Sequence, residues 1–295
     1  MTALTERDRW QGYWRSDAPF HVEHRDGLSR TAQIIVVANQ KGGVGKTTTA
    51  LSVAAALAQQ SIRVLLVDSD PQANCTSGAG VRLPEGHPSI YEVLNDGLDV
   101  EKVIEPTNVN NLWLLPSSID LAGAEIELVS ALSREQQLRR ALESTREHFD
   151  IVIVDCPPSL GLLTINALSA ADGVLVPIQC EYYALEGLGA LTRNAELVRQ
   201  NLNPGLKITG FALTMYDGRT KLSHEVANEV RRHFGDLVFR TRIPRSVRLA
   251  EAPSYGQPIT VFDPSSRAAI AYHRLATEVW ERVLFSEAAA ARRSS

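Results

Sequence analysis

Short apolar runs alternate with amphipathic stretches along most of this 295-residue chain. The runs at 64–67 and 151–154 are continuously apolar, as expected of strands that are covered on both faces. The stretches between the runs carry apolar residues at helical spacing. Strands are predicted at 33–38, 62–67, 112–115, 150–155, 173–178, 207–214 and 238–243. Helices are predicted near 46–60, 89–95, 119–146, 160–170, 186–202, 220–234 and 266–285.

This alternation predicts an α/β fold, in which a mostly parallel sheet is flanked by helices on both faces. Ligands of such sheets bind at the carboxyl ends of the strands. The predicted domain spans 33–286, between a flexible N-terminal tail at 1–32 and a frayed C-terminal tail at 287–295. Trp10 and Trp14 would share one face if the first tail became helical, so a partner-docking stripe is an alternative to disorder.

A glycine-rich stretch at 39–49 joins the first predicted strand to the first predicted helix. This context is typical of a phosphate loop, in which backbone N–H groups surround an anion. Lys46 can reach the β- and γ-phosphates, and the Thr47 hydroxyl can bind Mg²⁺. The motif departs from G-x-x-x-x-G-K-[ST], because Gln40 stands at its first glycine position and a second lysine follows. The predicted nucleotide-binding residues of this loop are Lys41, Gly42, Gly43, Val44, Gly45, Lys46, Thr47 and Thr48.

Two further predicted strands end in acidic motifs, Asp-Ser-Asp-Pro-Gln-Ala-Asn at 68–74 and Asp-Cys-Pro-Pro at 155–158. A carboxylate at a strand end beside a phosphate loop can hold Mg²⁺ directly or through water, and Asp155 is predicted to do so. Asp68 or Asp70 could orient the water that attacks the γ-phosphate. Aspartates after strands also begin turns and cap helices, but the three motifs together favour a nucleotide site.

The composition, with 44% hydrophobic and 22% charged residues, is that of a soluble globular protein. No apolar stretch approaches the ~20 residues of a membrane-spanning helix, and charged residues occupy the N-terminus where a signal peptide needs an apolar core. The three cysteines lie far apart without a C-x-x-C motif. They argue against a disulfide framework or a zinc site and favour a cytoplasmic location.

The net charge of −4 is unevenly distributed. The segment 205–250 holds nine Lys or Arg and four Asp or Glu, a net charge of +5, so the remainder carries −9. A basic face on an acidic protein can bind a polyanion locally, although chance clustering on a solvated surface gives the same composition.

In these motifs the chain resembles ParA/Soj-type chromosome-partitioning ATPases, which belong to the deviant Walker A, MinD-like group of P-loop NTPases. The resemblance runs from about 33 to 285, and its discriminating pieces are Asn-Gln-Lys-Gly-Gly and Asp-Pro-Gln-Ala-Asn, which resemble Soj-like ParA proteins rather than MinD. The segments that carry it are 39–49, 68–74, 155–163, 179–187 and 243–256.

The resemblance implies Mg²⁺-dependent ATP hydrolysis by a homodimer that encloses ATP between its subunits. It further implies that the ATP-bound dimer binds double-stranded DNA without sequence preference, and that a ParB-type partner stimulates hydrolysis and thereby release. The implied role is the segregation of a chromosome or plasmid, in the cytoplasm and on the nucleoid.

The resemblance also assigns roles to individual residues. Lys41 resembles the signature lysine that contacts the partner subunit's nucleotide, and with Lys46 and Asp70 it completes the implied catalytic set. Asp70 would position water, while Thr47 and Asp155 would hold Mg²⁺, the latter through water. The implied DNA-binding residues are Arg219, Lys221 and Arg248. The base of the nucleotide is expected near Met215, Pro244 and Arg245.

Three alternatives use the same fold. A MinD-like membrane ATPase needs a basic amphipathic C-terminal helix, whereas the end of this chain is mixed in charge and then alanine-rich. An iron–sulfur relative needs cluster cysteines at a dimer interface, whereas Cys156 and Cys180 read as small packing residues. A small-molecule synthetase needs a second substrate pocket, and the Soj-like segments argue against this alternative.

Overall fold

The structure is a computed structural model that describes residues 31–181 and 186–294. The tail prediction, with Trp10 and Trp14, falls almost entirely on residues 1–30, which lie outside the described residues. The compact unit Ala32–Ser295 contains all of the described helices and strands. Within the described part of the chain, no helix is long and apolar enough to cross a membrane.

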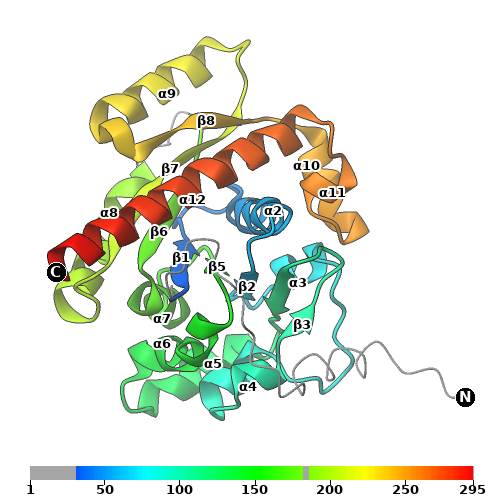
Figure 1. The fold of residues 1–295 in the computed structure, drawn as a ribbon, viewed down its shortest axis with the longest axis vertical. Coiled ribbons are helices and arrows are strands. Elements are labelled where there is room, and N and C mark those ends of the chain that lie inside the picture. Colours follow the sequence, from blue (N-terminus) through cyan, green and yellow to red (C-terminus); the bar gives the residue numbers. More distant parts are fainter. Residues whose placement is uncertain (1–30, 182–185, 295) are drawn as a thin grey trace, which may run out of the picture. The chain divides into compact units, whose positions relative to one another are not determined.

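An eight-stranded sheet forms the centre of this unit, in the order β3-β4-β2-β5-β1-β6-β7-β8 (Figure 1). All neighbouring strands are parallel except β3, which runs antiparallel to β4 at one edge. The predicted α/β class with a mostly parallel sheet is confirmed. The strands are β1 (Gln33–Val37), β2 (Val64–Asp68), β3 (Glu105–Pro106), β4 (Leu112–Leu115), β5 (Ile151–Asp155), β6 (Gly173–Gln179), β7 (Lys207–Tyr216) and β8 (Val238–Pro244).

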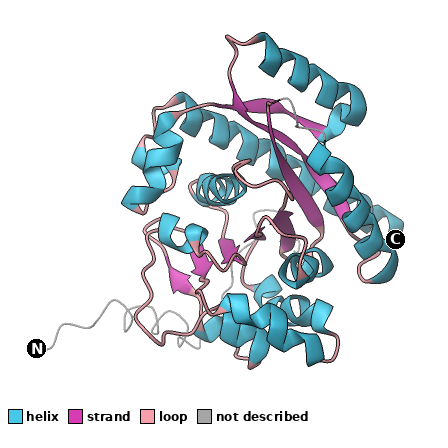
Figure 2. Cartoon of the chain, turned by 180° about the vertical axis from the view of Figure 1, so that it is seen from behind, coloured by secondary structure: helices cyan, strands magenta, loops and turns pink. Residues whose placement is uncertain are grey.

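Helices cover both faces of the sheet (Figures 1 and 2). Successive side chains of a strand point to opposite faces, so Ile34 and Val36 of β1 pack into one core and Ile35 and Val37 into the other. The first core includes residues of α4 to α9, and the second includes residues of α2, α3, α11 and α12. The helices are α2 (Lys46–Ala58), α3 (Asn74–Gly78), α4 (Ile90–Asn95), α5 (Leu121–Glu127), α6 (Gln137–Leu142), α7 (Leu162–Ala170), α8 (Glu186–Asn201), α9 (Lys221–Phe234), α10 (Val247–Glu251), α11 (Ile259–Phe262) and α12 (Arg267–Ser294).

The prediction of one continuous helix at 119–146 is wrong. It is divided into α5, α6 and short 3₁₀ turns, with extended backbone at Ala131 and a left-handed residue at Ser133. The break has a tertiary cause, because the Asn166 side chain of α7 accepts from Leu138 N (3.2 Å) and donates to Arg134 O (2.7 Å). At the other end of the chain, α12 continues to Ser294 and so passes position 286.

The strand register brings the sequence motifs together. Val37 at the end of β1 pairs with Asp155 at the end of β5, and Asp155 pairs on its other side with Asp68 at the end of β2. The carboxyl ends of these three parallel strands therefore lie at one edge of the sheet, which is the edge where such folds bind ligands.

Candidate functional site

Residues 38–45 form the loop between β1 and α2. Gly43 and Gly45 have φ values of 74° and 86°, in the left-handed region that glycine adopts without strain. A Cβ built on Gly42, Gly43 or Gly45 meets no atom within 4 Å. The glycines therefore allow the backbone conformation of the loop and leave its outer surface open to a ligand.

Two side chains that the sequence analysis did not predict hold this loop in place. The Asn39 amide donates to Pro177 O in β6 (2.7 Å), and its oxygen accepts from Lys41 N (3.0 Å). The Thr214 hydroxyl in β7 donates to Val44 O (2.8 Å). These contacts join the loop to strands that come more than 130 residues later in the chain, so no local signal could have indicated them.

Lys46 begins α2 and is largely buried, with 7% of its surface exposed. Its ammonium group donates to Lys41 O (3.3 Å). Burial lowers the pKa of Lys46, and the carboxylates of Asp155 and Asp70 partly oppose this effect. The ammonium group is thus partly desolvated, and a phosphate would give it an oppositely charged partner.

Asp155 lies at the end of β5 and is fully buried. Neither of its carboxylate oxygens has a hydrogen bond of good geometry from the described residues. Burial raises its pKa well above the ordinary range, the charge of Asp68 adds to this, and the neighbouring Thr47 hydroxyl opposes it. A buried carboxylate without a partner is costly. Carboxylate and hydroxyl oxygens suit Mg²⁺, so Asp155 and Thr47 fit the ion that the sequence predicted here.

Asp68 and Asp70 have different environments, which separates the two candidates for orienting water. The Asp68 carboxylate accepts from Asp70 N (3.1 Å) and from both Thr76 N and Thr76 Oγ1 (2.7 Å each). Burial raises the pKa of Asp68 to about 6, although these hydrogen bonds lower it. Asp70 accepts from Gln72 N through Oδ1 (3.0 Å). Asp68 thus holds the turn into α3, and Asp70 is the better candidate for a catalytic role.

The residues predicted near the base lie together at the ends of β7 and β8. Tyr216 pairs with Pro244 in the sheet, and Arg245 N donates to Tyr216 O (3.1 Å). Met215 has a φ of 50°, an uncommon conformation for a residue with a side chain. Arg245 forms an ion pair with Glu181 (2.9 Å). Met215 directly follows Thr214, so this group is connected to the phosphate loop.

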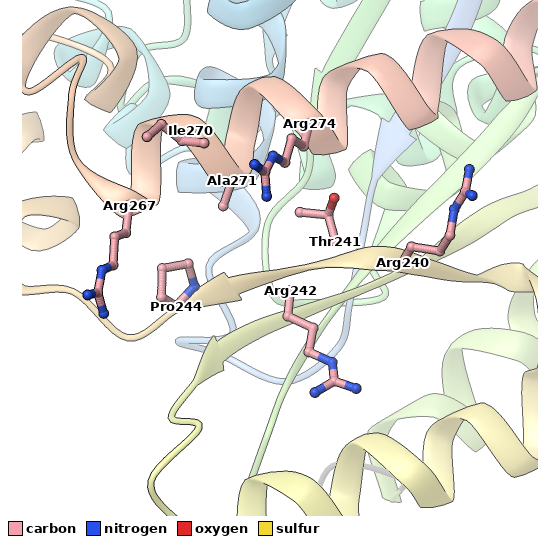
Figure 3. Close-up of a pocket in the computed structure, with 8 residues that line it drawn as sticks. All are labelled: Arg240, Thr241, Arg242, Pro244, Arg267, Ile270, Ala271 and Arg274. Atoms are coloured by element: carbon pink, nitrogen blue, oxygen red, sulfur yellow. The ribbon is translucent and has the colours of Figure 1, made fainter.

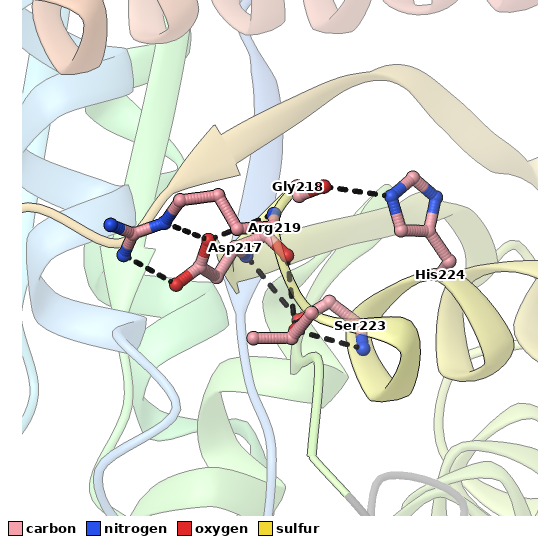
Figure 4. Close-up of polar contacts among 6 residues, drawn as sticks. Asp217, Gly218, Arg219, Ser223 and His224 are labelled. Atoms are coloured by element: carbon pink, nitrogen blue, oxygen red, sulfur yellow. Dashed lines mark hydrogen bonds and ion pairs between the residues drawn. The ribbon is translucent and has the colours of Figure 1, made fainter.

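The predicted DNA-binding residues are each paired with an acid. Arg219 is 90% exposed in its side chain, and its guanidinium group makes two hydrogen bonds to Asp217, at 2.8 and 2.9 Å (Figure 4). Lys221 pairs with Glu225 (3.2 Å) on α9.

Arg248 is more enclosed by its neighbours. It binds Asp263 (3.0 Å) and Glu251 (2.9 Å), and its guanidinium group stacks over Phe262 at 4.5 Å. Its availability to DNA is therefore lower than that of Arg219.

A cavity of about 640 Å³ lies between β8 and α12 (Figure 3). None of the phosphate-loop residues lines it. Two of its four arginines, Arg267 and Arg274, lie on α12, outside the basic segment 205–250. The lining residues are Arg240, Thr241, Arg242, Pro244, Arg267, Ile270, Ala271 and Arg274.

The fold and the site together define a P-loop nucleotide-binding protein with a second lysine in its loop. A family model described as AAA domain matches residues 32–208. The chain is 54% identical to the sporulation initiation inhibitor protein Soj of Bacillus subtilis, covering 84% of this chain and 98% of that protein. It is 53% identical to the chromosome-partitioning ATPase Soj of Thermus thermophilus, covering 84% and 96%. The chain belongs to the family of Soj and ParA chromosome-partitioning ATPases.

A solved structure is also similar. It is named cobyrinic acid a,c-diamide synthase from Mycobacterium smegmatis and contains ADP and magnesium. Its TM-score is 0.73 at 42% identity, and the match covers 83% of this chain and 93% of that one. Its ligands belong to the nucleotide class and the ion that the sequence predicts for this chain.

Proposed function

We propose that this protein is a Mg²⁺-dependent ATPase that partitions DNA. One observation carries the enzymatic part: the Asp155 carboxylate is fully buried, has no hydrogen bond of good geometry from the described residues, and lies at a strand end that pairs with the end of β1, just before the phosphate loop. The relatives named for chromosome partitioning support the cellular role.

In the proposed reaction, the loop N–H groups and Lys46 bind the phosphates of ATP. Thr47 and Asp155 would hold Mg²⁺, which neutralises phosphate charge when bound. Asp70 orients the attacking water, while Asp68 keeps the turn that presents Asp70. Met215, Pro244 and Arg245 lie where the base would extend from the loop.

ATP also serves as part of a dimer interface in this proposal. Lys41 of each subunit contacts the nucleotide of the other subunit, which adds an attractive charge interaction in a site from which water is excluded. Hydrolysis removes the phosphate that both subunits bind, so the dimer separates. The state of the nucleotide thereby controls any property that requires two subunits.

DNA binding is the proposed property. Arg219, Lys221 and Arg248 contact phosphates of the duplex, and contacts of this kind do not depend on sequence. Binding anywhere on a nucleoid requires this lack of preference. Hydrolysis, stimulated by a ParB-type partner, then releases the protein from DNA.

A second candidate function comes from the similar structure that is named a synthase. A small-molecule ligase of this fold would turn over ATP only with an acceptor substrate, and DNA would not affect its turnover.

The decisive experiment is to measure ATP turnover and duplex binding with ATP, with ADP and without nucleotide, each with and without the ParB-type protein of the same genome. We expect duplex binding that requires ATP, and turnover that rises when DNA and the ParB-type protein are both present. Turnover that responds to a metabolite and not to DNA would establish the synthase alternative.

A further inference from the structure

The side chain of Ser117 donates a hydrogen bond to the main chain of Asp70. The Ser117 hydroxyl lies 2.8 Å from Asp70 O, and both residues are buried. Ser117 comes 47 positions later in the chain, two residues after the end of β4. The end of β4 pairs with β2, the strand that leads to Asp70, so the two residues meet beyond neighbouring strand ends. Ser117 therefore contacts the proposed water-orienting residue from outside its own turn.

This contact closes a ring of buried hydrogen bonds around Asp70. The Asp68 carboxylate accepts from Asp70 N through Oδ1 (3.1 Å) and from Thr76 Oγ1 through Oδ2 (2.7 Å). Thr76 Oγ1 accepts in turn from Ser117 N (2.9 Å), and Ser117 Oγ donates to Asp70 O. Side chains thus hold both the N–H and the C=O group of Asp70, and Ser117 supplies two of the ring's donors.

The other hydrogen bonds of Asp70 are local to its turn. Asp70 O also accepts from Ala73 N (2.9 Å), and Asp70 Oδ1 accepts from Gln72 N (3.0 Å). Bonds between residues two or three positions apart fix the shape of a turn but not its position relative to the sheet. For the Asp70 peptide group, that position is set by the two side chains at strand ends, Asp68 after β2 and Ser117 after β4.

The segment that carries Ser117 is itself held on both sides. Pro116 O accepts from Ile90 N (2.9 Å), and Ser118 Oγ lies 3.1 Å from Ser89 Oγ. Ser89 is the N-cap residue of α4 and forms a capping box with Glu92. A group whose support is fixed by further hydrogen bonds positions its partner precisely. Ser117 is therefore a fixed point against which Asp70 is placed.

We propose that Ser117 is a positioning residue for ATP hydrolysis, which holds the Asp70 main chain so that the Asp70 carboxylate can orient the attacking water. This inference rests on the proposed function, in which Asp70 has that role. A group that orients a reacting molecule has to be held to within about 0.5 Å of the productive geometry. Ser117 meets this requirement through Asp70 and has no contact of its own with the nucleotide in this proposal.

The test compares Ser117→Ala and a control variant with wild type, as full chains. Ser117→Ala removes the hydroxyl and keeps the N–H group that Thr76 accepts. Thr145→Val is the matched control, because the buried Thr145 hydroxyl also donates to a main-chain carbonyl, Leu142 O, over 2.7 Å. Thr145 lies beside the start of β1, at the opposite edge of the sheet from the phosphate loop, since Arg146 O accepts from Ala32 N.

Three quantities are measured for each protein: phosphate release as a function of ATP concentration with Mg²⁺, the affinity for a non-hydrolysable ATP analogue, and the melting temperature. We expect kcat of Ser117→Ala to fall at least about tenfold, because a displacement of about 1 Å in an orienting group can cost about a hundredfold in rate. Its KM and its affinity for the analogue should stay within about twofold of wild type. Thr145→Val should lose melting temperature and keep its turnover.

Two results of this comparison would overturn the inference. One is a kcat of Ser117→Ala equal to that of wild type. The other is an equal loss of turnover in Ser117→Ala and Thr145→Val, because the loss would then come from reduced stability and not from the position of Asp70.

A double-mutant cycle with Asp70→Asn tests whether Ser117 acts through Asp70. In the Asp70→Asn background, Ser117→Ala should reduce the residual turnover by no more than about twofold, because there is no carboxylate left to position. An equal loss in both backgrounds would show that Ser117 acts independently of Asp70 and would overturn the inference. Wild-type turnover in Asp70→Asn would contradict the proposed function and the inference together, whereas impaired Asp70→Asn with unimpaired Ser117→Ala would contradict the inference alone.

Discussion

The hydroxyl of Thr214 donates a hydrogen bond to the carbonyl oxygen of Val44 over 2.8 Å, between residues 170 positions apart. Both residues are buried. This bond fixes the phosphate loop to the end of β7, and the residues that follow Thr214 lead to the group at Met215, Pro244 and Arg245. One contact therefore links the phosphate loop to the strand that carries the expected base site.

Thr214→Val should destabilise the protein by about 1–3 kcal/mol, because the buried Val44 carbonyl would lose its donor. ATP affinity should fall as well, since the loop would lose one of the two side chains that hold it. Thr214→Ser keeps the hydroxyl and is the control. Thermal unfolding and calorimetric titration with ATP measure both effects, and identical affinities in the two variants would show that the bond is irrelevant to the loop.

Lys46→Ala should weaken ATP binding at least about tenfold, because hydrogen bonds to charged groups contribute roughly 1.5–3 kcal/mol. Lys41→Ala should leave the ATP affinity of the monomer near wild type and weaken ATP-dependent dimerisation. Calorimetry and light scattering distinguish these outcomes. Lys41 would be an ordinary surface lysine if the second variant dimerised as wild type does.

Asp70→Ala should keep ATP binding and stability but lose turnover, so that the ATP-bound dimer accumulates. Asp68→Ala should instead lower the free energy of unfolding by about 2–3 kcal/mol, because two backbone N–H groups and the Thr76 hydroxyl would lose their acceptor. Turnover assays and chemical denaturation separate the two roles. Full turnover in Asp70→Ala would move the water-orienting role to Asp68 or Asp155.

The pH dependence of stability should be altered in Asp155→Asn. Burial raises the pKa of Asp155 in the folded state, so the native protein holds this proton to a higher pH than the unfolded chain does. The free energy of unfolding therefore falls as the pH rises above the unfolded pKa near 4. Asparagine does not ionise, so the nucleotide-free variant should lose this part of the pH dependence. Denaturation curves between pH 4 and 8 without Mg²⁺ measure it.

Asp155→Asn also tests whether Asp155 helps to hold Mg²⁺. ATP with Mg²⁺ should raise the melting temperature of wild type, and EDTA should reverse most of the increase. Asp155→Asn should show a smaller increase and a smaller response to EDTA. An equal response in both proteins would exclude Asp155 from holding the ion.

Because Arg219 is paired with Asp217, one substitution in this pair should raise the affinity for duplex DNA and the other should lower it. Hydrogen bonds from Arg219 lower the pKa of Asp217 to about 2. Asp217→Asn frees Arg219 from a competing carboxylate and should strengthen duplex binding, whereas Arg219→Ala should weaken it for all sequences alike. Each lost phosphate contact should reduce the slope of log affinity against log salt by about 0.9. Arg248→Ala should have the smaller effect, since Arg248 already binds two acids and stacks on Phe262.

Duplex affinity in an Arg219→Ala/Arg248→Ala double variant is the strictest check of this surface. If it equals that of wild type while dimerisation with ATP is intact, DNA does not bind through these residues.

The features of this protein that are encoded locally can be predicted from its amino-acid sequence. The alternation of apolar runs and amphipathic stretches gave the α/β class, because burial on both faces of a parallel sheet needs continuous apolar strands. The stretch 39–49 and the aspartates at 68, 70 and 155 were evident as motifs, because each combines a strand end with residues suited to phosphate or Mg²⁺.

Tertiary structure alone decided what depends on residues far apart in the chain. The Thr214–Val44 bond and the pairing of Asp155 with Asp68 each join segments that carry no local sign of one another. The break near Ala131 arises in the same way, because Asn166 of another helix hydrogen-bonds Arg134 and Leu138. Asp68 and Asp70 have different roles because the folded chain surrounds the Asp68 carboxylate with hydrogen-bond donors. The two aspartates are two positions apart and acquire this difference only when the chain folds.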